Sequence, residues 1–269
     1  MKYSVPFLAI IACTLGACQS DAKSEKGFVE KILLPKNEPF SVEKFTLNFK
    51  DITVSQGLKV EIYKAESTYV EVEGPKNLAN QIDLQVEGVN LVVHCKAGIT
   101  ASAMDEVVVK IFSPNINRIE ATNAAEITIK DYFAQENVLI RAISGAAIQG
   151  EVVADNLEID AGSSAEVDMK VQSDNLKIVC SSSSVIKLKG RVDKAYFETS
   201  SSALLEAYNL KVTEAEILAS SSSTIKSTVE MLLKAVSSSG ATVDVVGSRD
   251  LRVLQNDANN GSHINIKYN

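Results

Sequence analysis

The sequence lacks tryptophan, contains only two histidines and four cysteines, and carries more acidic than basic residues. Without tryptophan, flat aromatic side chains on which sugar rings could stack are scarce. The 27 basic and 34 acidic residues give a net charge of −7, which argues against nucleic-acid binding through phosphates. The composition therefore disfavours a nucleic-acid-binding protein.

The sequence motifs of common catalytic sites are absent as well. The chain has no GxGxxG, P-loop, CxxC or HExxH pattern. His94 and Cys95 are adjacent, so on a strand their side chains point to opposite faces and cannot share a metal ion. We therefore predict no catalytic residues, no metal site of this kind and no cofactor.

The first residues have the layout of a secretory signal peptide. Lys2 precedes an apolar run over residues 5–12 that is too short to cross a bilayer as a permanent helix. Leu15-Gly16-Ala17-Cys18 then resembles the bacterial lipobox, in which the cysteine is lipidated and becomes the first mature residue. We predict a signal peptide over residues 1–17 and a lipidated Cys18. The alternative is an ordinary signal peptide cut after an A-x-A-like triplet.

The lipid anchor predicts where the protein is located. Residues 18–39 begin with the lipidated cysteine and continue as a flexible tether of small and charged residues. Gln19 follows Cys18, whereas an Asp there resembles an inner-membrane retention signal. We therefore expect lipid anchoring in the outer membrane, with the domain facing either the periplasm or the outside. The membrane is then a partner through the anchor.

Two cysteines remain in the predicted mature domain. Cys95 and Cys180 both fall on the apolar side of alternating stretches. Such a position is typical of a small buried residue. We therefore predict two free core cysteines rather than a disulfide framework.

The most informative property is a repeat that begins near residue 116. Seven segments carry a Ser/Ala/Gly cluster, and each cluster opens with one small residue. These residues are Ala121, Ala142, Ala161, Cys180, Thr199, Ala219 and Ala235. Their spacing is near 19 residues, and no helical periodicity occurs within a segment, which predicts a β-solenoid.

Apolar residues alternate within each repeat, as Leu157, Ile159 and Ala161 show. Alternation indicates strands with one buried face, one before and one after the serine cluster. We therefore predict an all-β fold, a parallel β-helix with coils of about 19 residues. Serine, of which the chain has 29, suits a sharp corner because it is small, and buried hydroxyls would bond one another from coil to coil. A nucleophilic serine would need a nearby base, and both histidines lie outside the serine repeats.

A column of acidic residues recurs at the other turn of the repeat. The spacing is 19 residues, and the members are Glu136, Asp155, Asp174 and Asp193. One interpretation is ordinary turn chemistry, since Asp and Asn side chains bond nearby backbone. The other is an acidic stripe that binds a hard cation such as calcium.

The remaining regions are predicted from turn residues and alternation. Residues 40–115 form a less regular β-rich section that caps the solenoid, with a tight hairpin at Glu87-Gly88. Residues 116–269 contain the serine-rich coils and end, from Asp250, in a C-terminal cap.

The stretches FKDITVSQGLKVEIYKAESTYVEVEGPKNLANQIDLQVEGVNLVV and VVVKIFSPNINRIEATNAAEITI resemble the head GIN domain family. The resemblance covers about residues 40–268 and implies a parallel β-helix, an exported lipoprotein and an adhesin-type role without a catalytic residue set. The family's Ser-Gly-Ser-Gly corner departs here to serine and alanine. Only Ser144-Gly145 and Ser239-Gly240 keep the Ser-Gly pair.

These observations favour a cell-envelope lipoprotein with a rigid β-helix that acts as a non-enzymatic binding or adhesion module. An extracellular glycan or protein is the expected partner, and the oligomeric state stays open. Two alternatives remain. One is a polysaccharide-active β-helix enzyme, which rests on fold analogy alone. The other is a structural envelope lipoprotein without a ligand.

Overall fold

The computed structural model describes residues 39–99 and 103–269, and most of this part of the chain is β-strand. One short helix occurs among the described residues, α1 (Lys76–Ala79). The strands are β1 (Phe40–Phe45), β2 (Asp51–Val54), β3 (Lys59–Lys64), β4 (Tyr69–Pro75), β5 (Ile82–Glu87), β6 (Asn90–Cys95), β7 (Val108–Ser113), β8 (Arg118–Ala121), β9 (Glu126–Ile129), β10 (Phe133–Ile143), β11 (Ala147–Gly162), β12 (Glu166–Cys180), β13 (Val185–Thr199), β14 (Leu204–Ala219), β15 (Thr224–Ser237), β16 (Thr242–Gly247), β17 (Arg252–Ala258) and β18 (His263–Tyr268).

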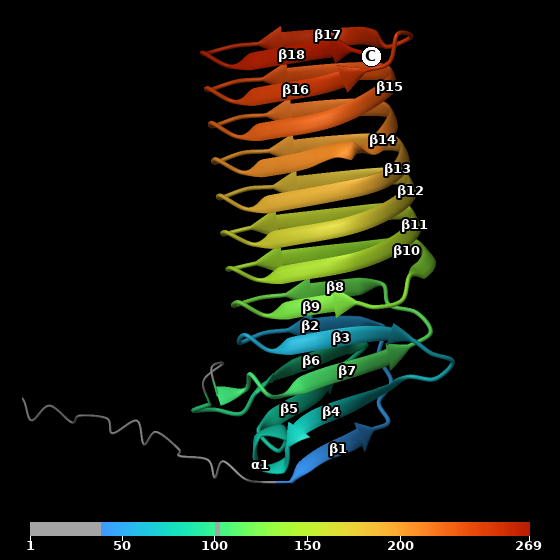
Figure 1. The fold of residues 1–269 in the computed structure, drawn as a ribbon, viewed down its shortest axis with the longest axis vertical. Coiled ribbons are helices and arrows are strands. Elements are labelled where there is room, and N and C mark those ends of the chain that lie inside the picture. Colours follow the sequence, from blue (N-terminus) through green and yellow to red (C-terminus); the bar gives the residue numbers. More distant parts are fainter. Residues whose placement is uncertain (1–38, 100–102) are drawn as a thin grey trace, which may run out of the picture. The chain divides into compact units, whose positions relative to one another are not determined.

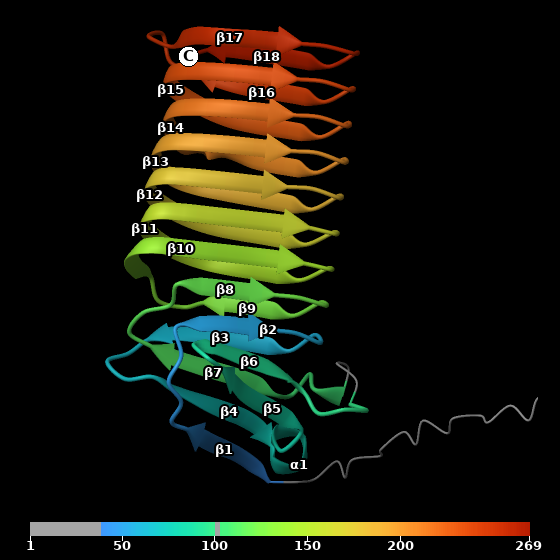
Figure 2. The same ribbon diagram turned by 180° about the vertical axis from the view of Figure 1, so that it is seen from behind.

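From β8 onward the strands form the predicted parallel β-helix, whose coils stack in sequence order (Figure 1). The register repeats the predicted spacing, because Ala161 lies beside Cys180 and Cys180 beside Thr199. The same stack seen from behind shows the strands of the opposite side (Figure 2). The prediction of an all-β solenoid with coils of about 19 residues is confirmed.

One spacing derived from the sequence is wrong. Ala235 was aligned with Ala219, but the structure pairs Ala219 with Ser237 and Ile217 with Ala235. The serine cluster of that repeat therefore begins two residues later. Ser237 is fully buried, so a hydroxyl replaces the methyl group at this interior position.

The core is a column of alternate residues that runs through all coils. Cys180, Ile178 and Val167 are completely buried, as the alternation predicts. Cys180 and Cys95 are both free and buried, which confirms the prediction of core thiols. The alternation breaks at the serine turn, where Ser163 and Ser182 are exposed, and at the opposite corner, where Asp155 and Asn156 are both exposed.

The serine turn of each coil, which we call the tip, is a two-residue turn with positive φ at both positions. In one coil Ser182 and Ser183 have φ of 54° and 59°, and in the next Ser201 and Ser202 have φ of 54° and 61°. This is the geometry of the turn that favours glycine and asparagine. Small size is therefore not the main demand at the tip. The main requirement is the backbone conformation, which serine adopts less readily than glycine.

The tips are held together by backbone hydrogen bonds. The amide of Ser183 donates to the carbonyl of Ser201 at 3.0 Å, and the amide of Ser164 donates to the carbonyl of Ser182 at 2.9 Å. Each tip thus bonds the next, and this satisfies peptide groups that a turn usually leaves to water.

The residue that closes each tip points inward and is alanine or serine. Where it is serine, the hydroxyl is buried and bonded, as predicted, but mainly to backbone. Ser184 Oγ donates to the carbonyl of Ala161 at 2.8 Å, one coil away. Thr199 and Ser223 form the hydroxyl pair of the predicted kind, at 2.8 Å. The hydroxyl ladder is thus largely a hydroxyl-to-carbonyl connection.

The N-terminal section has strands in the predicted places but stacks them in an unexpected order. The turn formed by β2 and β3 pairs with β6 and β7 on one side and with β8 and β9 on the other. Strands β1, β4 and β5 add antiparallel pairs. The hairpin at Glu87-Gly88 is present between β5 and β6.

The C-terminal segment predicted as a cap forms a further coil of the same kind. Strands β17 and β18 pair in parallel with β15 and β16. Asn260 and Gly261 form its tip, with φ of 52° and 75°. Among the described residues, no strand covers the other side of this coil.

Candidate functional site

The acidic residues predicted to form a column lie on the second corner of the coil, which we call the Asx corner. Glu136, Asp155, Asp174 and Asp193 are exposed and occupy equivalent places, because the residues on either side of them pair in register. In residues 39–99 and 103–269, no group of three or more His, Cys, Asp or Glu side chains is close enough to hold a metal ion. Cation binding at this column stays a prediction. Cys18, the predicted lipidation site, lies outside the described residues.

The residues that directly follow the acidic column form a ladder of hydrogen-bonded asparagine side chains. Asn156 Nδ2 donates to Asn137 Oδ1, and Asn175 Nδ2 donates to Asn156 Oδ1, both at 3.0 Å. Lys194 takes the equivalent position in the next coil and ends this amide ladder. Asn156 and Asn175 each donate one of their two N–H groups in these bonds, and Asn137 only accepts, so every amide of the ladder keeps at least one N–H group that can donate elsewhere.

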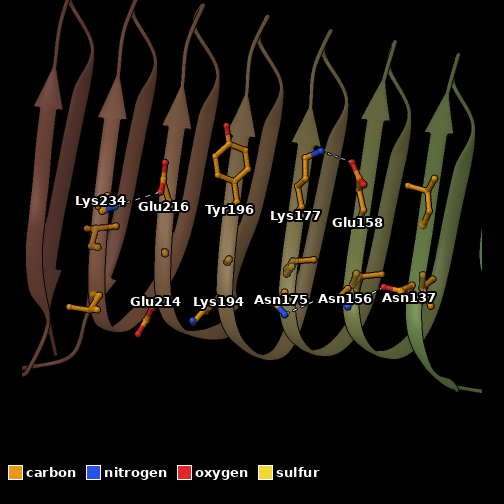
Figure 3. A pocket seen from close by; sticks show the side chains of 18 of the residues that line it. Asn137, Asn156, Glu158, Asn175, Lys177, Lys194, Tyr196, Glu214, Glu216 and Lys234 are labelled. Atoms are coloured by element: carbon orange, nitrogen blue, oxygen red, sulfur yellow. Dashed lines mark hydrogen bonds and ion pairs between the residues drawn. The ribbon is translucent and has the colours of Figure 1, made fainter.

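A groove of about 730 Å³ runs beside this ladder, on the side formed by β10 to β15, and Leu254 of β17 lines its end (Figure 3). The amide ladder forms one wall. The residues two positions further along each strand form the other, among them Glu158, Lys177 and Tyr196. We call this feature the Tyr196 groove.

The floor of the groove is apolar, and two alanines occupy neighbouring positions in its middle. Leu176, Ala195, Ala215 and Leu233 occupy equivalent positions in four consecutive coils, and all four are buried. Alanine is shorter than leucine, so less side chain fills the space beneath the middle of the groove. Tyr196 follows the first alanine and stands at that point.

The second wall is a row of charges paired between coils. Lys177 Nζ lies 2.8 Å from a carboxylate oxygen of Glu158, and Lys234 Nζ lies 3.9 Å from one of Glu216. The hydrogen bond to Glu158 raises the pKa of Lys177 above its ordinary value. Lys177 therefore stays charged at neutral pH, and within each pair the lysine and the glutamate have opposite charges.

Tyr196 stands between these two ion pairs, with its ring half-buried. Its hydroxyl donates to Glu198 Oε2 at 3.2 Å. Partial burial and the nearby Glu198 carboxylate raise the pKa of Tyr196, so the hydroxyl remains protonated at neutral pH. The bond limits the rotation of the ring and leaves one aromatic face toward the groove.

The sequence interpretation did not identify this groove. Its acidic column stands beside the groove, but Tyr196 and the asparagines were not singled out as binding residues. The alternation that predicts Ala195 as buried also predicts Tyr196 as outward-facing. The signal in the sequence is a pair of alanines, Ala195 and Ala215, at equivalent positions of neighbouring strands, next to a lone outward aromatic residue.

The described residues contain no helix that is long and apolar enough to cross a membrane. Cys180 is also no candidate nucleophile, because burial raises the pKa of its thiol. Reactive cysteines are those in which the thiolate is stabilised and exposed.

Solved structures of similar fold come from species of Parabacteroides and Bacteroides. A putative adhesin of Parabacteroides merdae has a TM-score of 0.78 and 18% identity, over 86% of this chain and 97% of that one. A putative lipid binding protein of Parabacteroides distasonis has a TM-score of 0.74 and 20% identity, over 86% and 98%. A putative adhesin of Bacteroides fragilis has a TM-score of 0.62 and 15% identity, over 87% and 98%. At these identities the likeness shows the fold.

No curated protein matches the chain significantly. The family model that matches is described as "Putative auto-transporter adhesin, head GIN domain", and the match spans residues 48–248. That span contains β2 to β16 and every residue that lines the Tyr196 groove except Leu254. The chain therefore belongs to the head GIN domain family.

Proposed function

We propose that the chain is a non-enzymatic binding or adhesion module of the bacterial cell envelope, anchored by a lipidated Cys18 in the outer membrane. The Tyr196 groove carries this proposal, because it offers a continuous surface with hydrogen-bonding groups on both walls and an apolar floor. Ligand sites in proteins typically combine an apolar surface with a few placed polar groups. The names of the family and of two solved relatives are consistent with adhesion.

The first test measures adhesion on whole cells. Cells that express the full chain are compared with a deletion strain for attachment to immobilised matrix proteins and glycans, and soluble products are analysed in parallel. Attachment that depends on the chain, without degradation of the surface, supports the proposal. Chain-dependent release of oligosaccharides would favour the polysaccharide-active enzyme. If the chain caused neither attachment nor release of oligosaccharides, a structural lipoprotein would be favoured.

The second test addresses the anchor. Cys18→Ser removes the thiol that would carry the lipid, so the protein should leave the outer-membrane fraction and lose its labelled fatty acid. Cys13→Ser is the matched control, because it changes a cysteine within the predicted signal peptide. Full retention of Cys18→Ser in the membrane would contradict lipid anchoring.

One solved relative is described as a lipid binding protein, which gives the second candidate function. The apolar floor of the groove is the observation that favours it. Binding of the full chain to radiolabelled fatty acid, abolished by Ala195→Glu in the groove floor and kept by Tyr208→Ala, would support this alternative.

A further inference from the structure

We propose that the Tyr196 groove binds a linear, uncharged glycan that runs along the stack, with one sugar ring packed against Tyr196. This inference rests on the proposed function, because it names the ligand class of the same groove.

Charge in the groove favours an uncharged ligand. The charged lining residues are three glutamates and three lysines, so their sum is zero. They are Glu158, Lys177, Lys194, Glu214, Glu216 and Lys234. Two of the lysines already pair with glutamates of neighbouring coils. A polyanion or polycation would therefore meet as much repulsion as attraction.

The backbone of the groove excludes one common mode of peptide binding. Extended peptides often add a strand to an open sheet edge through main-chain hydrogen bonds. The groove lies across the middle of a sheet, where β13 pairs with β12 on one side and β14 on the other. Their peptide groups are used by the neighbouring coils, so the ligand must be recognised by side chains.

The side chains that remain have the chemistry of sugar recognition. A sugar ring has an apolar C–H face and a rim of hydroxyl groups. The ring of Tyr196, oriented by its bond to Glu198, offers a flat surface to the apolar C–H face of the sugar. The free N–H groups and lone pairs of the amide ladder from Asn137 to Asn175 suit the second.

The repeat of the protein favours a polymer. Equivalent positions recur at each coil, about 4.8 Å apart, which is comparable with the width of a sugar ring, and amides occupy three consecutive ones. A linear glycan along the stack would therefore meet the amide ladder on one side and the charged row on the other at successive units. A single fatty acyl chain would match the floor but neither wall.

The test is calorimetric titration of the full-length chain, purified in detergent, with cellohexaose, xylohexaose and mannohexaose. An alginate hexamer, a lysine hexapeptide and phosphatidylglycerol vesicles are the charged and lipid probes. Tyr196→Ala removes the platform, and Tyr196→Phe keeps it. Tyr208→Ala is the matched control, because Tyr208 is an exposed tyrosine outside the groove.

We expect at least one neutral hexasaccharide to bind, about tenfold more weakly to Tyr196→Ala and unchanged to Tyr196→Phe and Tyr208→Ala. Circular dichroism shows whether each variant remains folded. If Tyr196→Ala does not fold, Asn156→Asp provides the same test by placing a charge in the amide ladder. Binding of only the charged or lipid probes, or equal affinity of all variants, would overturn the glycan assignment while cell attachment could still support the proposed function. If cells that express the full chain also attached no better than the deletion strain, both the glycan assignment and the proposed function would be overturned.

Discussion

The N-terminal strands and the regular coils differ in how chain order relates to stacking order. From β8 to β18 each coil follows the previous one both in sequence and in space. In the N-terminal section, β6 and β7 follow β2 and β3 in sequence but lie on the opposite side of them from β8 and β9. A repeat in the sequence therefore predicts neighbours only where the chain does not return to an earlier coil.

The tips differ between the two regions as well. In the N-terminal section Gln56-Gly57 forms the tip between β2 and β3, whereas Asn123-Ala124 forms the tip of the first regular coil and pairs of serines form the tips of the middle coils. All adopt positive φ. The regular coils thus accept less favourable residues at the tip, because backbone bonds from tip to tip hold each turn on both sides.

The largest expected effect on stability comes from adding a methyl group at a glycine between closely stacked coils, compared with the same change in the open N-terminal hairpin. A Cβ at Gly190 would lie 2.0 Å from the carbonyl oxygen of Val171 in the preceding coil, whereas a Cβ at Gly88 would meet nothing within 4 Å. We expect Gly190→Ala to lower the free energy of unfolding by about 3 kcal/mol or more. Gly88→Ala should cost about 1 kcal/mol, from its positive φ alone. Urea denaturation measures both, and equal losses would contradict close coil stacking.

The second effect concerns the interior of a regular coil. Cys180 is completely buried, so Cys180→Leu forces extra methyl groups into a filled space and should cost about 1–3 kcal/mol. Ser181, the next residue, is only partly buried, and Ser181→Lys should cost less. Thermal melts compare the two. If Ser181→Lys lowered the melting temperature more than Cys180→Leu, the assignment of Cys180 to the buried face and Ser181 to the outer face would be wrong.

The third effect concerns the tips. Replacing Ser182 and Ser183 by glycine should raise the free energy of unfolding by about 1 kcal/mol for each residue, because glycine adopts positive φ without strain. Gly57→Ser in the N-terminal section is the reverse change and should lower stability by a similar amount. A loss of stability in the double glycine variant would show that the serine side chains contribute more than the backbone requires.

The smallest effect is a difference in pH dependence. The hydrogen bond from Lys130 lowers the pKa of Glu61 in β3, so its contribution is present above pH 4.5 and is lost as the pH falls through the lowered value. In the coils, Glu166 raises the pKa of Lys187, so that contribution is present below pH 10.5 and is lost as the pH rises through the raised value.

Lys130→Met should therefore reduce stability at neutral pH by less than any of the three changes above, and it should flatten the acid limb of a stability–pH curve. Lys187→Met should flatten only the alkaline limb. The two variants are compared by urea denaturation from pH 3 to pH 11. An unchanged acid limb in Lys130→Met would contradict the role of Glu61.

The coils could be predicted from the sequence because every interior position recurs with the same parity. Ala161 and Cys180 were identified in this way. The stacking order of the N-terminal strands could not be predicted. No residue pattern in β2–β3 or β6–β7 indicates which pair stacks next to the regular coils. The positive φ at the tips could not be predicted either, because serine, unlike glycine, rarely adopts that conformation and so does not indicate it.

The site was predictable only in part, for a related reason. The outward position of Tyr196 follows from alternation, but the groove depends on two alanines that become neighbours only in register, Ala195 and Ala215. The acidic column was noticed because its charges repeat. A groove made by small residues leaves no such mark in the sequence.

The most direct test of the account is hydroxyl-radical footprinting of the tyrosines, with and without the neutral hexasaccharide that binds best. Tyr132, Tyr208 and Tyr268 are exposed and lie outside the groove, so they serve as internal controls. The account predicts that the ligand slows oxidation of Tyr196 and leaves the controls unchanged. Unchanged oxidation of Tyr196 together with protection of a control tyrosine would contradict it.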